Sequence, residues 1–281
     1  MRRLILFAAA PAALLVAFGP SSAQAARTDI APPGAASATA LQVGDLIGVS
    51  TTGATAAADN STAEASVLDV GGEPVLGLGG SQSGDGQNSG ALVDTGSAAP
   101  ARIQVAPWEA SSGTTGTERT SHGSAAAARA EVPAVADVSA LQSESQASHR
   151  SEKSTAAGSS DAVTLGLTDF LRVVLLHSEV SSEGTGSSYL ASVNGTEIGS
   201  DEQLGEICAL EVSPVAKLSC LVASGGLGAD GLTSGAADLA TLESALRPLD
   251  SVSAFAVRGS SGAGAEPVTA PTPTEVVAGA E

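Results

Sequence analysis

The 281-residue sequence is poor in aromatic residues, cysteine and positive charge, and each shortage excludes a class of protein. Aromatic residues make up 2% of the chain. Ligand pockets usually rely on aromatic walls, so a small-molecule or cofactor pocket is not expected. The two cysteines are too few for a disulfide-dense scaffold or a four-thiolate zinc site. Twelve Lys and Arg against 30 Asp and Glu give a net charge of −18, which argues against a nucleic-acid partner because phosphate binding needs basic residues.

The N-terminal segment has the three parts of a secretory signal peptide. Two arginines at positions 2–3 precede an apolar stretch at 4–18, and an Ala-Gln-Ala motif at 23–25 provides a cleavage site. The apolar stretch is too short to cross a bilayer comfortably. We therefore predict a signal peptide over residues 1–25. The mature protein is then secreted, extracellular or associated with the cell wall, with no transmembrane segment after cleavage.

Short apolar runs separated by turn residues predict an all-β body at 41–258, between a linker at 26–40 and a flexible Pro/Gly/Ala tail at 259–281. Asn194-Gly195 and Gly71-Gly72 each follow a short apolar run and predict two-residue hairpin turns. Aligning these turns also aligns LQVGDLIGVS with LGLTDFLRVV. Residues 41–77 and 164–200 thus form a possible internal duplication, with chance similarity in a biased composition as the alternative. We expect an antiparallel β-sandwich or an elongated β-layer with long hairpins.

Other segments of the body carry weaker signals. The Ala/Ser/Thr tracts at 51–66 and 111–128 can form thin strands or flexible polar stretches. The glycine-rich segment 77–90 is predicted to be a loop. Leu239, Leu242 and Leu246 have the spacing of one helical face, and Pro248 would end such a helix. We therefore predict one short helix at 236–246.

The two cysteines enclose the segment CALEVSPVAKLSC, which can fold in half about Pro214. In that register Cys208 faces Cys220, and Leu210 faces Leu218. Export provides an oxidising compartment, so we predict an intramolecular Cys208–Cys220 disulfide. A redox pair or metal site is the alternative, but the C-x-x-C spacing and a nearby histidine are both missing. No metal site is predicted.

The most suggestive catalytic motif is Asp94-Thr95-Gly96, preceded by two apolar residues. It is similar to the catalytic loop of aspartic proteases, in which two carboxylates share a proton and activate a water. A second such motif is missing from the chain, so a turn after a short strand is the simpler interpretation. Asp94 therefore remains a candidate site residue, and no catalytic residue is assigned.

The single tryptophan and the three histidines complete the candidate list. Trp108 either fills a core made of small residues or stacks on a sugar, and the first interpretation is favoured. Of the histidines, His122 and His149 lie in polar surroundings and are expected to be solvated. His177 follows an apolar run and is expected to mark the exit of a strand to solvent. A hydrolase triad lacks the G-x-S-x-G motif that would support it.

The leader, the acidic Ala/Ser/Gly/Thr-rich body, the two similar segments and the SYLASVNGTEI hairpin together resemble secreted actinobacterial envelope proteins, including those called choice-of-anchor proteins. The chain departs from anchored members because it lacks a C-terminal sorting signal. The resemblance implies an extracellular structural or interaction protein without catalytic activity, whose partners would be cell-envelope components or other surface proteins. A secreted hydrolase using Asp94 and a carbohydrate-binding module using Trp108 and Tyr189 remain the alternatives.

Overall fold

The computed structural model describes residues 31–263 apart from 45, 97–100, 169, 201–209, 213–215, 228–231 and 245–250. The described residues form antiparallel strands, as the all-β prediction required, and among them no helix is long and apolar enough to cross a membrane. The strands are β1 (Gly34–Val43), β2 (Ile47–Ala56), β3 (Ser61–Val70), β4 (Glu73–Pro74), β5 (Gly79–Ser83), β6 (Gly86–Gly90), β7 (Val93–Asp94), β8 (Arg102–Val105), β9 (Trp108–Thr115), β10 (Glu118–Val132), β11 (Ala136–His149), β12 (Lys153–Leu167), β13 (Leu171–Val180), β14 (Gly186–Val193), β15 (Thr196–Ser200), β16 (Leu210–Val212), β17 (Ala216–Leu227), β18 (Leu232–Ser244) and β19 (Ser251–Ala263).

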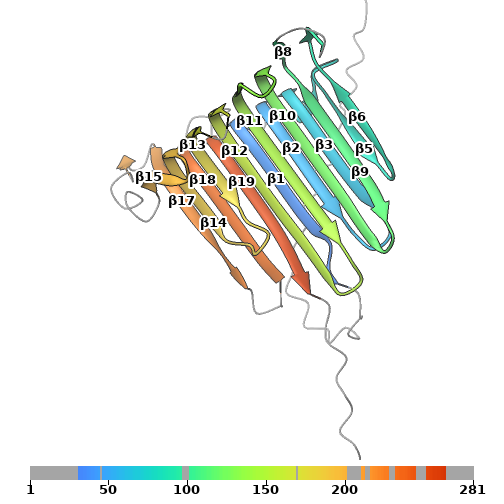
Figure 1. Ribbon diagram of the computed structural model, residues 1–281. Helices are drawn as coiled ribbons and strands as arrows, with labels where there is room; N and C mark the ends of the chain where they lie inside the picture. The colour runs from blue at the N-terminus through green and yellow to red at the C-terminus, as the bar shows by residue number, and fades with distance from the viewer. Residues whose placement is uncertain are drawn as a thin grey trace, which may run out of the picture.

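The strands lie in two facing layers, which gives a β-sandwich of long, tilted strands (Figure 1). Layer A has the order β5, β3, β2, β1, β19, β18, β17, β16. Layer B has the order β6, β9, β10, β11, β12, β13, β14, β15. Beyond the end of β9, strand β8 pairs with β10, and β7 pairs with β8. A short pairing of β12 with β19 joins the layers at one end.

The glycine-rich segment 77–90, predicted to be a loop, instead forms β5 and β6 and closes one edge of the sandwich. Strand β5 pairs with β3 in layer A, and β6 pairs with β9 in layer B. The chain therefore crosses from one layer to the other at Gly84-Asp85. The loop prediction was wrong because glycine weakens a strand in isolation, whereas here two neighbouring strands supply the missing stability.

The space between the layers is filled mainly by alanine and serine side chains. Buried alanines and serines alternate with outward-facing residues along β2, β3, β11 and β12. The layers approach so closely that a Cβ on Gly34 would lie 2.5 Å from the carbonyl oxygen of Thr155 in the opposite layer. A Cβ on Gly123 would likewise overlap the Glu64 carbonyl oxygen. The Ala/Ser/Thr tracts at 51–66 and 111–128 are therefore mostly strands, since small side chains permit this thin core.

A single crease crosses both layers and bends every long strand. Along it, the pairing between neighbouring strands that both cross the crease skips one residue on each strand, as between Thr39↔Thr51 and Leu41↔Val49. Alternate strands place a residue with positive φ on this line: Ser50, Phe255 and Leu221 in layer A, and Leu141, Leu176 and Gly199 in layer B. Such a conformation costs a bulky residue about 1–2 kcal/mol. Burial of Phe255, Leu221 and their neighbours in one apolar cluster offsets this cost.

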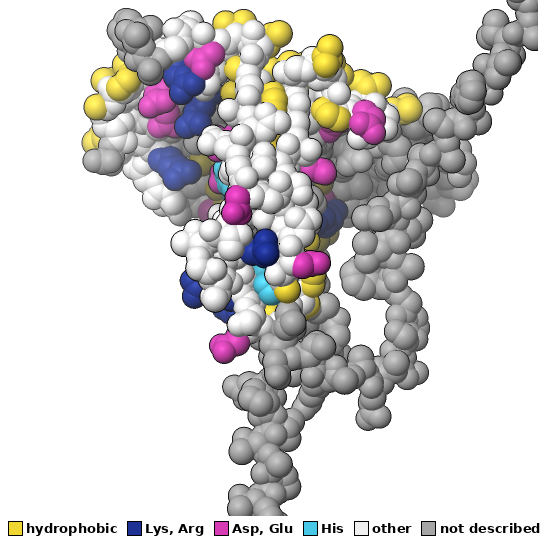
Figure 2. Space-filling view, turned by 90° about the vertical axis from the view of Figure 1, so that its right-hand side faces the viewer, with side chains coloured by type: hydrophobic (Ala, Val, Ile, Leu, Met, Phe, Trp, Pro, Cys, Tyr) yellow, Lys and Arg dark blue, Asp and Glu magenta, His cyan; other side chains and the backbone are white. Residues whose placement is uncertain are grey.

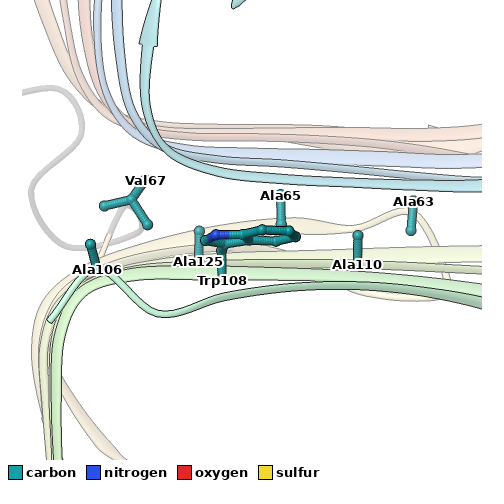
Figure 3. Packing of buried hydrophobic residues seen from close by; sticks show 7 residues of the cluster. All are labelled: Ala63, Ala65, Val67, Ala106, Trp108, Ala110 and Ala125. Carbon is teal, nitrogen blue, oxygen red and sulfur yellow. The ribbon is translucent and has the colours of Figure 1, made fainter. Parts of the chain in front are cut away.

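Beyond the crease the two layers turn away from each other, as Figure 3 shows on its left side. We call the strand ends beyond the crease the flange, with one wing from each layer. Wing B comprises residues 102–105, 128–132, 136–140, 163–167, 171–175, 191–193 and 196–198. Wing A comprises residues 41–43, 47–49, 68–70, 240–244 and 251–254 together with the ends of β16 and β17.

Cross-strand rows in the flange alternate strictly between apolar and mostly polar residues. In wing B the apolar rows are Val105–Ala128–Ala140–Val163–Leu175–Ala191–Ile198 and Ile103–Ala130–Val138–Leu165–Val173–Val193. In wing A they are Leu68–Val49–Leu41–Ala254–Ala240 and Val70–Ile47–Val43–Val252–Leu242. The rows between them carry polar residues such as Gln104, Arg129, Gln42 and Ser253. The flange thus has one apolar face and one largely polar face.

The apolar face of the flange is exposed to solvent. Most of the large hydrophobic residues that are exposed in the described chain lie in the flange, in its turns, or at the crease, Val222 being next to crease residue Leu221. Leu76, Leu92 and Val93 lie outside these segments, after β4 and at β7. Figure 2 shows hydrophobic side chains gathered at the upper end of the molecule in that view. The sandwich body below the crease is covered mainly by polar and small residues.

The two predicted hairpin turns are confirmed. Val193 pairs with Thr196 across Asn194-Gly195, and Val70 pairs with Glu73 across Gly71-Gly72. The segments around them form corresponding three-stranded meanders, β1–β2–β3 in layer A and β12–β13–β14 in layer B. The internal duplication stays a hypothesis about origin, although each similar segment forms the same kind of flange hairpin.

Several predicted boundaries need correction. The helix predicted at 236–246 was wrong, because residues 232–244 form strand β18, which pairs with β17 and β19 along its length. The first strand begins at Gly34, within the segment 26–40 that was predicted to be a linker. The last strand runs to Ala263, inside the tail predicted to begin at 259. In each case strand pairing with a distant segment orders residues whose local propensity is weak.

Candidate functional site

A polar groove of about 650 Å³ lies in the corner between the outer face of layer B and the flange. It contains both candidate residues predicted from the sequence, Asp94 and Trp108, which are fourteen positions apart but are brought together by β7, β8 and β9. Other side chains reach the groove from β6, β8, β9, β10 and β11: Gln87, Ser89, Arg102, Gln104, Glu109, His122, Ser124, Arg129, Gln142 and Glu144. The lining is therefore dominated by amides, hydroxyls and charged groups.

Asp94 holds the β7–β8 hairpin together and is fully engaged by donors. The Arg102 guanidinium donates to both carboxylate oxygens, at 3.1 Å to Oδ1 and 2.6 Å to Oδ2. The Gly96 amide donates to Oδ1 at 2.9 Å, and the Gln104 side chain donates to Oδ2 at 3.0 Å. The hydrogen bond from Arg102, assisted by Gly96, holds the pKa of the Asp94 carboxyl far below its usual range. A carboxylate held in this way is poorly suited to share a proton with a second acid, as aspartic-protease chemistry requires.

The second ion pair of the groove joins two neighbouring strands. Nε2 of His122 on β10 lies 3.0 Å from Oε1 of Glu144 on β11. This hydrogen bond raises the pKa of His122 and lowers the pKa of Glu144. The prediction that His122 is solvated is therefore incomplete, because its ring nitrogen is occupied by the carboxylate. That contact leaves Nε2 unavailable to activate a serine nucleophile.

Trp108 forms the floor of the groove and part of the core beneath it. The indole is 8% exposed and packs with Ala65, Val67 and Ala125 between the two layers (Figure 3). Its Nε1 donates to the Gly77 carbonyl at 3.3 Å. Gly80 and Gly90 lie against the ring, and a Cβ on Gly80 would come within 2.6 Å of it. The ring therefore fills a slot in the core, and its face is not presented for stacking on a sugar.

A second cluster lies further along the same corner, where three strands place a buried histidine between two acids. Nδ1 of His177 lies 2.5 Å from Oδ1 of Asp161, and Nε2 lies 3.2 Å from Oε2 of Glu179. The Tyr189 ring stacks on the imidazole at a centroid distance of 4.5 Å. Burial opposes protonation of His177, but the hydrogen bond with Asp161 and the neighbouring Glu179 carboxylate outweigh it and raise its pKa to about 9. Burial, followed by the same two acids, raises the pKa of Tyr189 to about 12.

No sequence motif pointed to this cluster. His177 was predicted to leave its strand for solvent, whereas its side chain is buried. The pairing of β12 with β13 sets it opposite Asp161, and the pairing of β13 with β14 sets it opposite Tyr189. His149 was predicted to be solvated but is also buried, where it is hydrogen-bonded at 2.9 Å to the Ala31 carbonyl. The contacts of His177 with Asp161 and Tyr189 depend on the register of three strands, and only a correct prediction of that register could have revealed them.

The remaining predicted site is the cysteine pair. Cys208 and the side chain of Cys220 lie outside the described residues. The register predicted around them is confirmed, because Leu210 pairs with Leu218 and Glu211 with Lys217. The disulfide itself stays a prediction. Within the part of the chain that the structure describes, no group of three His, Cys, Asp or Glu side chains is placed to hold a metal ion.

Comparison of the chain with protein families, curated proteins and solved structures found no match. The groove and the flange are therefore the features of the molecule that bear on its function.

Proposed function

We propose that this is a secreted, non-catalytic interaction protein whose polar groove binds a neutral, hydroxyl-rich polymer such as an envelope polysaccharide. The N-terminal leader motif supports secretion, and the resemblance to actinobacterial envelope proteins supports a surface role. Secretion would bring the groove into contact with extracellular polysaccharides.

The observation that carries the proposal is the balance of charge in the groove. Two arginines face three acids, Asp94, Glu109 and Glu144, and His122 adds a positive charge when it is protonated. The groove therefore has a formal charge between −1 and 0, which favours neither a polyanion nor a polycation. Its ion pairs are already formed, so Asp94 and Glu144 are held in place before any ligand binds.

Neutral sugars fit this chemistry because each hydroxyl can donate and accept a hydrogen bond. Gln104 and Gln142 contribute amides from the flange and from the body, on opposite sides of the corner. Ser89 and Ser124 add hydroxyls. The contact would be made by hydrogen bonds along the groove, since the rings of Trp108 and Tyr189 are buried.

Affinity electrophoresis in gels containing soluble β-glucan, mannan, galactan or dextran tests the proposal. We expect at least one of these to retard the protein. The double variant Gln104→Ala/Gln142→Ala should lose about tenfold or more in affinity. The loss of each side-chain amide removes a hydrogen bond worth about 1 kcal/mol. The matched variant Gln42→Ala, on the polar rows of the other wing, should bind like the unmodified protein.

Failure of all four polysaccharides to retard the protein would reject the proposed ligand class. The hydrolase alternative has its own measurement. If the protein released reducing ends or peptide fragments, and Asp94→Asn abolished that release, a catalytic role would replace binding. Turnover that Asp94→Asn left unchanged would exclude the aspartic-protease version.

A further inference from the structure

The largest feature that the proposed function leaves unused is the apolar face of the flange. Its cross-strand rows contain Ala, Val, Leu and Ile on both wings, and the charged residue Glu73 lies at the end of one row, opposite Val70. Ile47, Leu41 and Leu242 on wing A and Ile198, Leu175 and Val138 on wing B are each more than a third exposed. This strict alternation is the pattern of a sheet that has one face covered.

The size of the face is that of a stable protein interface. The crease crosses six strands in each layer, which at about 4.8 Å per strand gives a width of about 29 Å. Three residues beyond the crease on wing A and five on wing B, at about 3.3 Å each, add up to about 26 Å. The resulting area of about 750 Å² is close to the ~800 Å² that each partner contributes to a standard interface. Apolar patches on soluble monomers usually reach only about 300–600 Å².

The chemistry of the face favours a second copy of this chain over a lipid surface. Proteins that rest on membranes usually combine apolar residues with Lys, Arg, Trp or Tyr at the headgroup level. The apolar rows of the flange carry none of these, and the chain has a net charge of −18. A sheet face built mainly of aliphatic residues, with Glu73 and Thr196 at the ends of two rows, is instead the surface that packs on another such face at about 10 Å, as in any β-sandwich.

We infer that two molecules associate end to end through their flanges, with the apolar faces stacked and the two sandwich bodies pointing in opposite directions. The wings come from opposite layers of one sandwich, so a two-fold axis along the strands relates them approximately, β1–β2–β3 corresponding to β12–β13–β14. Such a face is self-complementary, as a two-fold dimer requires. The grooves remain open, because they lie on the polar side of the flange.

Sedimentation velocity and light scattering on the protein secreted with its own leader test this inference. We expect the mass of two chains across about 1–100 μM, since interfaces of this size dissociate at micromolar or lower concentrations. The variant Ile47→Lys/Ile198→Lys places one unpaired charge on each wing, and it should raise the dissociation constant about a hundredfold or more. The variant Gln42→Lys/Glu197→Gln changes the net charge equally on the polar side and should remain dimeric.

Circular dichroism of the two variants separates lost association from lost folding. Monomeric behaviour of the unmodified protein at about 100 μM would overturn the inference. So would dimers that persist in a folded Ile47→Lys/Ile198→Lys variant. Flotation of the unmodified protein with phosphatidylcholine vesicles, together with a monomeric mass in solution, would assign the face to lipid instead. Loss of polysaccharide binding would leave this inference intact, because the two faces are separate.

Discussion

The buried His177 between Asp161 and Glu179 makes a quantitative prediction about stability and pH. Its pKa is about 9 in the folded protein and 6.5 in the unfolded chain. The folded state therefore binds the proton more tightly, and the resulting stabilisation is complete below about pH 6.5 and is lost as the pH rises through about 9. The difference of about 2.5 pH units corresponds to about 3 kcal/mol, most of which persists at pH 7.

We expect the free energy of unfolding to fall by about 2 kcal/mol between about pH 7 and about pH 9.5. Urea unfolding followed by Trp108 fluorescence measures this free energy, because Trp108 is the single tryptophan of the chain and is buried in the core. This pH range ends below the ordinary tyrosine pKa of about 10. In the folded protein Tyr189 stays protonated throughout the range, since its pKa is about 12. The variant His177→Gln should be less stable at pH 7, and its stability should be nearly independent of pH over this range.

A second histidine variant serves as the control. His122 also has a raised pKa, but its partner Glu144 is on the surface, so His122→Gln should keep most of the pH dependence. If His177→Gln retained the full decrease of stability between neutral and alkaline pH, another group would be responsible. A constant stability of the unmodified protein over the same range would refute the assignment of a charged His177 altogether.

Two further predictions concern the core and the cysteines. Gly123→Ala should destabilise the protein by about 1–3 kcal/mol or more, because its Cβ would collide with backbone across the thin core, whereas Gly113→Ala meets no atom within 4 Å and should change the urea midpoint little. A Cys208–Cys220 disulfide should leave no thiol to react with a thiol reagent under denaturing conditions, and its reduction should lower stability by about 2–3 kcal/mol. Two titratable thiols in the freshly secreted protein would contradict the pairing.

Hairpin chemistry is the part of the fold that could be predicted well from local sequence. Asn194-Gly195 and Gly71-Gly72 define their turns because both positions need positive φ, and the structure has φ of 51° and 81° at the first pair. The pairing of Leu210 with Leu218 followed from folding a short segment about one proline. The segment 232–244 shows the limit of this reasoning. Its leucines have helical spacing, but two neighbouring strands offer hydrogen bonds along its full length.

The groove could be predicted only in fragments. Asp94 and Trp108 were recognised as unusual residues, and the structure agrees with the favoured interpretation of each: Asp94 lies in a hairpin and Trp108 fills the core. The pairs Asp94–Arg102 and His122–Glu144 depend on strand registers spanning 8 and 22 positions. The His177 cluster depends on two more registers. One-residue slips would move these side chains to the other face, so no local pattern could have specified them.

The amino-acid sequence by itself determined an acidic all-β chain with a thin core. Few aromatic residues and many Ala, Ser and Gly allow two layers to approach closely, and alternation in LQVGDLIGVS and LGLTDFLRVV already separates apolar from polar side chains. Tertiary structure alone decided where those apolar residues go. Bent strands align along a single crease only when all twelve are paired, and that alignment turns their apolar faces outward onto one end of the molecule.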